Sequence, residues 1–162
     1  MPKVTLLCYL KNEARYLRQM IESGLDQAFE DFEFLLLDNG STDASRAIVE
    51  SFSDPRIRLL AFDEDISGPE RDFGHLNTVA FQAARGDLVA VVGGDDLIMP
   101  DRLARQVRAF DQDPQLDCCH SMARHIDRDS NLLATFFNSA PYHGWNFLRI
   151  CFQFCNLAYP TV

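Results

Sequence analysis

Two adjacent carboxylates, Asp95 and Asp96, follow an apolar run in the stretch DLVAVVGGDDLIMP. Two such charges about 4 Å apart repel by roughly 1 kcal/mol in water, and by several-fold more near a protein surface. A divalent cation between them reverses the sign, and Mg²⁺ or Mn²⁺ typically binds one or two carboxylates together with substrate phosphates. The pair therefore indicates a site for a metal ion and a phosphate-bearing ligand; a solvated turn with Asp96 as a helix cap is the alternative.

A second polar stretch, DNGSTD, follows an apolar run that ends at Leu37. An Asx-type turn leading into a helix N-cap accounts for Gly40, Ser41 and Asp43. It does not account for Asp38, which stands directly after the apolar run. A carboxylate at that position can accept a hydrogen bond from a ring N–H or from a ribose hydroxyl.

Alternating elements must position these groups. Apolar runs predict strands over residues 4–10, 32–37, 57–62 and 88–92. Apolar residues at helical spacing predict helices over about 12–28, about 44–52, before Gly86 and after Pro100. This order predicts an α/β fold with a Rossmann-like, mostly parallel sheet flanked by helices and joined by right-handed crossovers. In such sheets ligands bind at the carboxyl ends of the strands, where both polar stretches fall.

The last 50 residues are less regular. Strands are predicted over 116–126 and 132–137, around a polar turn, and a helix over about 144–156. We therefore expect one domain in two parts, an α/β subdomain over 1–112 and a less regular region over 113–162. Aromatic residues cluster near the end of the chain, and an exposed apolar segment there would favour self-association.

Composition excludes several classes of function. The formal net charge of −9 argues against binding to nucleic acid, which needs a basic surface. No apolar run is long enough for a transmembrane helix, and no signal peptide is recognisable. The five cysteines fit no zinc pattern, so reduced thiols and a cytoplasmic setting are expected, with a peripheral position at the inner face of the membrane as the alternative. No G-x-G-x-x-G follows the first strand, which argues against a dinucleotide-binding dehydrogenase.

Three motifs, in their order, resemble the family 2 glycosyltransferases of GT-A fold: VTLLCYLKNEARYL, LLLDNGSTDAS and ARGDLVAVVGGDDLIMPDRL. On the nucleoside side, the resemblance implies that Tyr9 and Leu10 lie along the base and that Asp38 and Asn39 hydrogen-bond to base and ribose. It places Arg71 near the base or the phosphates. Many members carry Asp where this chain has Asn39, which leaves the choice between UDP and dTDP less defined.

On the diphosphate side, the resemblance implies that Asp95 lies near the ribose and sugar and that Asp96 binds the Mn²⁺ or Mg²⁺ that bridges the diphosphate. Many members read D-x-D-D, and Gly93 stands in place of the first Asp, so the metal site has fewer carboxylates. The common Arg-Asn pair before the fourth strand is replaced by Leu76-Asn77. Arg71 would supply the missing positive charge.

The implied reaction is inverting transfer of a hexosyl group from a UDP- or dTDP-sugar to a hydroxyl of a glycan or other acceptor, as in polysaccharide biosynthesis. A general base must take the acceptor proton. The family carries this Asp or Glu downstream of the position of Val162, so we expect a piece of a longer enzyme. The resemblance thus implies a nucleotide-sugar-binding subdomain over 1–112 and the start of an acceptor-side region over 113–162. A non-catalytic nucleotide-sugar-binding or scaffold domain is the alternative. A sugar nucleotidyltransferase is disfavoured because the stretch LKNE is not a glycine-rich, basic phosphate loop.

Overall fold

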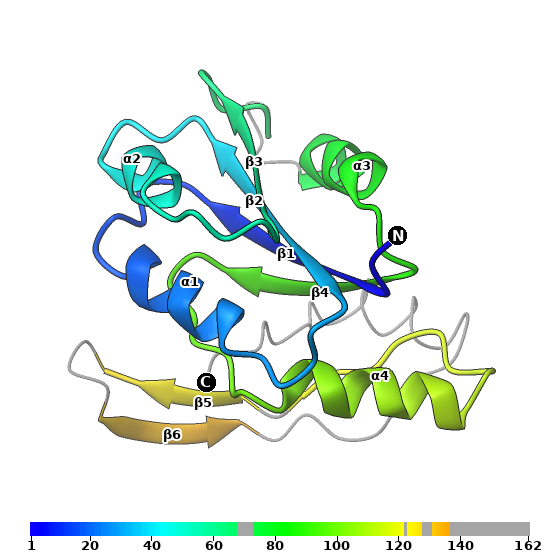
Figure 1. Ribbon diagram of the computed structural model, residues 1–162. Helices are drawn as coiled ribbons and strands as arrows, with labels where there is room; N and C mark the ends of the chain where they lie inside the picture. The colour runs from blue at the N-terminus through cyan, green and yellow to red at the C-terminus, as the bar shows by residue number, and fades with distance from the viewer. Residues whose placement is uncertain (68–72, 122, 128–130, 137–162) are drawn as a thin grey trace.

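A parallel four-stranded sheet forms the centre of the protein (Figure 1). The computed structural model describes residues 1–67, 73–121, 123–127 and 131–136. The sheet has the order β3-β2-β1-β4 and contains β1 (Val4–Leu10), β2 (Phe32–Asn39), β3 (Ile57–Phe62) and β4 (Leu88–Gly93). The fold class is therefore α/β, and the strand positions confirm the prediction to within two residues at each end.

Helices cover both faces of this sheet, because the side chains of each buried strand alternate between two apolar clusters. Leu6 of β1 packs in the cluster formed with α1 (Leu17–Leu25), α2 (Ser45–Glu50) and α4 (Arg102–Gln112). Leu7 packs in a smaller cluster against α3 (Phe73–Ala83), which lies on the opposite face (Figure 1). The result is a three-layer arrangement.

Helix α1 is shorter than the predicted span of about 12–28. Asn12 has a left-handed φ of 59°, which a helix does not allow. The helix ends at Leu25, and the N–H of Ala28 donates to the carbonyl of Pro100, 2.8 Å away, instead of continuing the helical ladder. Tertiary hydrogen bonds have therefore replaced the helical ones at this end of the helix.

The strand predicted over 116–126 is also too long. Asp113 turns the chain, because its carbonyl accepts from the N–H of Leu116 and its carboxylate from that of Gln115. Among the described residues of this span the strand is β5 (Ala123–Ile126), which pairs antiparallel with β6 (Leu132–Phe136). The predicted helix over 144–156 and the apolar segment at the end of the chain lie outside the described residues. The end of α4 coincides with the predicted boundary at 112, while the functional division into two regions stays a prediction.

The order in which strands are added to the sheet reverses between β1 and β4. From β1 the chain adds β2 and then β3 on one side, and then crosses over to place β4 on the other side of β1. Such a switch point is where open α/β sheets bind ligands, in the crevice outside the carboxyl ends of the two strands. Among the described residues no helix is both long and apolar enough to cross a bilayer.

Candidate functional site

Strand register brings three predicted motifs to one edge of the sheet. Leu10, at the end of β1, lies opposite Asp38 of β2, and Tyr9 lies opposite Gly93 of β4. The chain segments that follow these residues therefore emerge side by side. We call this side, with the loops that leave it, the carboxyl edge.

The two carboxylates of the GGDD turn converge on one point beside Gly93. Asp96 is 5% exposed, whereas Asp95 is exposed. A Cβ atom added to Gly93 would lie 3.0 Å from Asp95 Oδ1 and 3.0 Å from Asp96 Oδ2. A side chain at this position would therefore occupy the space that the two carboxylates share.

This end of the sheet is strongly negative. Burial raises the pKa of Asp96 to about 6, and the charge of Asp95 adds to the rise. The hydrogen bond that Asp96 accepts from the N–H of Gly93, at 3.1 Å, acts in the opposite direction. Burial and the charge of Asp95 also raise the pKa of Glu13, whose Cγ lies 2.9 Å from the position of a Cβ on Gly94. The charge of Asp95 thus raises the pKa of both neighbouring acids, while Arg102 and His125 act on Asp96 in the opposite direction. Acids with pKa values raised by burial and by like charge are found preferentially at functional sites.

The space beside Gly93 suits a divalent cation. Its two carboxylate oxygens are hard ligands of the kind that Mg²⁺ and Mn²⁺ prefer. Within the described ranges no group of three or more His, Cys, Asp or Glu side chains could hold a metal ion. An ion here would therefore depend on oxygens from a ligand, such as the phosphates of a nucleotide, to complete its coordination.

Asp38 is fully buried at the end of β2 and is held by the protein. Its Oδ1 accepts from the N–H of Ser41 at 2.9 Å, and its Oδ2 accepts from Arg46 Nε at 3.2 Å. Arg46 also donates to the carbonyl of Phe62 at 2.7 Å, at the end of β3. In this conformation Asp38 fixes the turn after β2, and its predicted contact with a nucleotide stays a prediction.

Three other predicted nucleotide-binding residues lie at or near the same edge. The hydroxyl of Tyr9 donates to Asn77 Oδ1 of α3 at 2.6 Å, and Leu10 is 2% exposed, in the core. Both polar groups of the Asn39 amide are engaged by the loop that follows β3, through Asp65 and Ile66. Arg71 lies outside the described residues.

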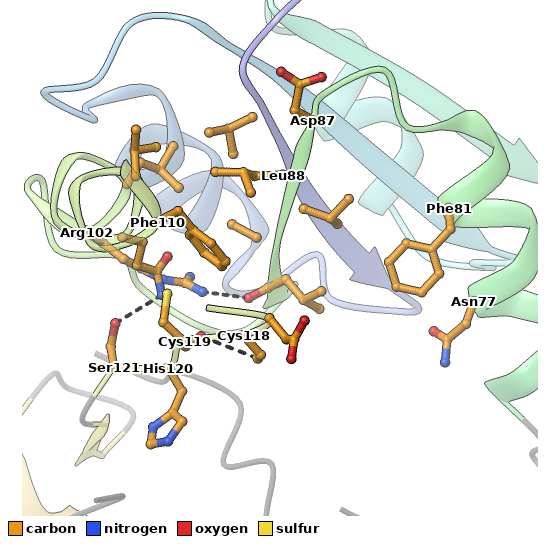
Figure 2. Close-up of a pocket in the computed structure, with 18 of the residues that line it drawn as sticks. Asn77, Phe81, Asp87, Leu88, Arg102, Phe110, Cys118, Cys119, His120 and Ser121 are labelled. Carbon is orange, nitrogen blue, oxygen red and sulfur yellow. Dashed lines mark hydrogen bonds between the residues drawn. The ribbon is translucent and has the colours of Figure 1, made fainter. Parts of the chain in front are cut away.

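A groove of about 460 Å³ runs beside this edge, along the free side of β4 (Figure 2). β4 forms one wall, and α4 and residues 117–121 form the others. Arg102 lines the groove at 8% exposure and donates to the carbonyl of Val91 at 2.9 Å. Its Nε and Nη1 have no acceptor among the described residues, and burial lowers the pKa of its guanidinium to about 10. Neither Asp95 nor Asp96 lines this groove.

Sequence reasoning missed three polar residues that organise this region: Arg46, Asp65 and Arg102. Arg102 could have been noticed, because a cation in the first turn of a helix opposes the helix dipole and needs another reason to be there. Asp65 stands two residues before Ser67, the spacing of an Asx turn, and its carboxylate accepts from the Ser67 N–H at 2.9 Å. No sequence signal pairs Arg46 with Asp38.

Comparisons with known proteins agree with this architecture. The family model "Glycosyl transferase family 2" matches residues 9–161. Chondroitin synthase from Escherichia coli is 29% identical over 139 residues, covering 85% of this chain and 19% of that protein. Succinoglycan biosynthesis protein ExoO from Rhizobium meliloti is 37% identical over 110 residues, covering 68% and 30%. The chain thus spans less than a third of these two relatives.

Solved structures show the same fold. TarS 1–349 from S. aureus, in complex with UDP-GlcNAc, has a TM-score of 0.60 and 26% identity, covering 68% of this chain and 31% of that chain. The mannosyltransferase PcManGT from Pyrobaculum calidifontis, solved with GDP-Man and Mn²⁺, has a TM-score of 0.60 and 24% identity, covering 71% and 34%. The predicted GT-A fold is confirmed by these neighbours.

Proposed function

We propose, because the chain belongs to glycosyl transferase family 2, that the carboxyl edge of its sheet binds a nucleotide-diphospho-sugar donor. The sugar would be transferred, with inversion, to a hydroxyl of a glycan or other acceptor. The observation that carries this proposal is the space beside Gly93, on which Asp95 Oδ1 and Asp96 Oδ2 converge at 3.0 Å each. Paired carboxylates in a crevice at the switch point suit a cation that carries a diphosphate.

On the diphosphate side, Asp96 and Asp95 would hold Mn²⁺ or Mg²⁺. When bound, the ion would neutralise the charge that develops on the departing nucleoside diphosphate. Asp96 Oδ2 accepts from the N–H of Gly93 and is also the oxygen that faces the space beside Gly93, so this hydrogen bond fixes its position toward the ion. Asp95 is exposed and would also lie near the ribose and the sugar.

On the nucleoside side, we assign Tyr9 and Leu10 to the wall along the base, and Asp38 and Asn39 to the base and ribose. Arg71 would lie near the base or the phosphates. TarS, at 26% identity, was solved with UDP-GlcNAc, which supports a uridine nucleotide over dTDP. The same comparison supports a hexosyl donor.

The acceptor side requires a base that takes the hydroxyl proton. By resemblance to the family we expect this base downstream of Val162, and the chain covers 19% and 30% of the two relatives named above. We therefore propose for the whole protein that it transfers sugar to a glycan or other acceptor in polysaccharide biosynthesis. We also propose that it lies in the cytoplasm or at the inner face of the membrane, and that it self-associates. If the base is missing, the domain binds its donor without transferring the sugar.

Thermal-shift titration with UDP, dTDP and GDP, each with and without Mn²⁺, tests the donor site. We expect stabilisation only when nucleotide and metal are both present, and its loss in Asp96→Ala. Asp54→Ala is the matched control, because Asp54 is ion-paired with Arg56 just before β3, at the opposite edge. Stabilisation by a nucleoside triphosphate alone would favour a nucleotidyltransferase. Binding of the donor by the full-length protein without sugar transfer would favour the scaffold alternative.

A further inference from the structure

The loop after β3, residues 63–67, lies directly against the turn that follows β2. Gly40 has a φ of +74°, and a Cβ added to it would lie 2.7 Å from the carbonyl carbon of Glu64 and 2.8 Å from the nitrogen of Asp65. Only glycine leaves room for two backbones at this separation. The loop and the carboxyl end of β2 are therefore in backbone contact.

Asp65 holds this loop in place from the side facing β1. Its carboxylate forms an ion pair with Lys11, the first residue after β1. It also accepts from Asn39 Nδ2 at 2.7 Å and from the N–H of Ser67 at 2.9 Å. One carboxylate thus joins the ends of two neighbouring strands and the loop from a third.

The hydrogen bond from Lys11, together with those from Ser67, holds the pKa of Asp65 well below its usual range, so the carboxylate is charged at neutral pH. The side chains of Lys11 and Asp65 are 44% and 37% exposed. The ion pair itself therefore adds little to stability. Its effect is on geometry, because it fixes where the Lys11 ammonium lies.

Asn39 is the residue through which this arrangement reaches the donor site. Its Nδ2 donates to Asp65 and its Oδ1 accepts from the N–H of Ile66 at 2.8 Å. The amide therefore has a fixed orientation, and its side chain is 6% exposed. Without Asp65, the Nδ2 group would keep only its long contact with Ser67 Oγ, at 3.5 Å, and the loop would lose its ion pair with Lys11.

We propose that Asp65 is a positioning residue of the nucleoside half of the donor site, acting through Lys11 and Asn39. The proposal rests on the donor site proposed above and adds a residue that neither the motifs nor the comparisons assign. It separates the two halves of the site: Asp65 sets the wall beside the nucleoside, and Asp95 and Asp96 hold the metal and the diphosphate. Loss of Asp65 should therefore weaken a nucleotide and leave a bare diphosphate unaffected.

The test compares UDP with inorganic pyrophosphate, each titrated calorimetrically into the purified chain with Mn²⁺. In Asp65→Ala we expect the Kd of UDP to rise about tenfold, the size expected for the loss of one or two hydrogen bonds. The Kd of Mn²⁺-pyrophosphate should change by less than about twofold. Asp54→Ala, which removes a carboxylate ion-paired at the opposite edge, should change neither. Lys11→Met should reproduce part of the effect of Asp65→Ala.

A rise in both Kd values by the same factor, or in neither, would overturn the positioning role. If Asp65→Ala does not fold, Asp65→Asn decides, because it keeps an acceptor for the Ser67 N–H and loses only the charge that holds Lys11. A selective rise for UDP then supports the proposal, and an equal change or none overturns it. If the unmodified chain binds neither UDP nor pyrophosphate, the proposed donor site is wrong. If the unmodified chain binds both and Asp65→Ala does not weaken UDP selectively, only the positioning role of Asp65 is wrong.

Discussion

The two edges of the central sheet carry polar networks of opposite character. At the amino edge, Glu33 is 6% exposed and accepts from Thr5 Oγ1 at 2.7 Å and from the N–H of Arg85 at 2.6 Å. Arg58 supplies the opposite charge, and Thr5 Oγ1 also accepts from the N–H of Gly86 at 2.9 Å. The buried carboxylate there is fully paired, and the charges balance.

At the carboxyl edge the acids beside β4 face one another. Burial and like charge raise the pKa values of Asp96 and Glu13. Buried acids whose pKa values are raised by like charge occur preferentially at functional sites. The comparison assigns stability to the amino edge and, under the proposed function, donor binding to the carboxyl edge.

The largest expected effect on stability comes from Glu33→Ala at the amino edge. This change removes the anionic partner of Arg58 at this edge and leaves the two donors with their second acceptors: the Ala83 carbonyl for Arg58 and Thr5 Oγ1 for the N–H of Arg85, each at 3.1 Å. We expect the free energy of unfolding to fall by about 2 kcal/mol, less than for a fully buried pair, because the Arg58 side chain is 30% exposed. Urea denaturation measures this loss, and UDP affinity of the folded fraction should stay unchanged. A loss below about 1 kcal/mol would place this network among ordinary surface pairs.

Asp96→Asn makes the complementary change at the carboxyl edge. Asn keeps an acceptor for the N–H of Gly93 and removes the charge. We expect Mn²⁺-dependent affinity for UDP to fall roughly 100-fold, equivalent to about 2.7 kcal/mol. Calorimetry measures this, and urea denaturation without ligand should show a change below about 1 kcal/mol. Unchanged metal-dependent binding would remove Asp96 from the site.

The same change, glycine to alanine, is expected to have different effects at the two edges. At Gly86 a Cβ would lie 2.4 Å from the backbone nitrogen of Thr5, so Gly86→Ala must shift backbone. We expect a loss of about 1–3 kcal/mol in stability, the usual range for overpacking, with normal UDP affinity per folded molecule. Gly93→Ala meets only the carboxylate oxygens of Asp95 and Asp96. It should weaken Mn²⁺-UDP binding about tenfold and change stability by less than about 1 kcal/mol. Equal effects of the two substitutions would contradict the comparison.

The smallest effect concerns pH. Burial acts to raise the pKa of Glu33, but hydrogen bonds from Arg58, Thr5 and the N–H of Arg85 outweigh it, and the net pKa is lowered. A lowered pKa means stability that is present above the unfolded value of about 4.3 and is lost as pH falls through the folded value. Between about pH 5 and pH 3 the unmodified chain should lose more stability than Glu33→Gln. Parallel stability curves for the two proteins would show that Glu33 is not linked to folding in this way.

Much of this architecture could be predicted from the sequence, because buried strands are marked by apolar runs. The apolar runs predicted the four strands and the end of the sheet at which the polar motifs lie, whereas the pairing of Leu10 with Asp38 and the position of β4 beside β1 come from the structure. The convergence of Asp95 and Asp96 could be proposed from their adjacency alone. Apolar periodicity therefore carried both the fold and the position of the site.

The remaining features depend on contacts between residues far apart in the chain. Asn39 was predicted to meet a nucleotide, and its amide is engaged by Asp65 and Ile66 of a loop that has no periodicity. The first turn predicted for α1 does not form, because Asn12 has a left-handed backbone φ of 59°. Neither contact leaves a local pattern, since side-chain hydrogen bonds across loops depend on where the loops lie in space.

Paramagnetic NMR tests the division between the two edges most directly. Substoichiometric Mn²⁺ with UDP, added to ¹⁵N-labelled chain, broadens amide signals close to the ion. The account predicts that the amides of Gly93, Asp95 and Asp96 disappear first, while those of Thr5, Glu33 and Gly86 stay sharp. Broadening at the amino edge, or an even loss of signal across the sheet, would contradict the claim that the carboxyl edge binds the metal and its nucleotide.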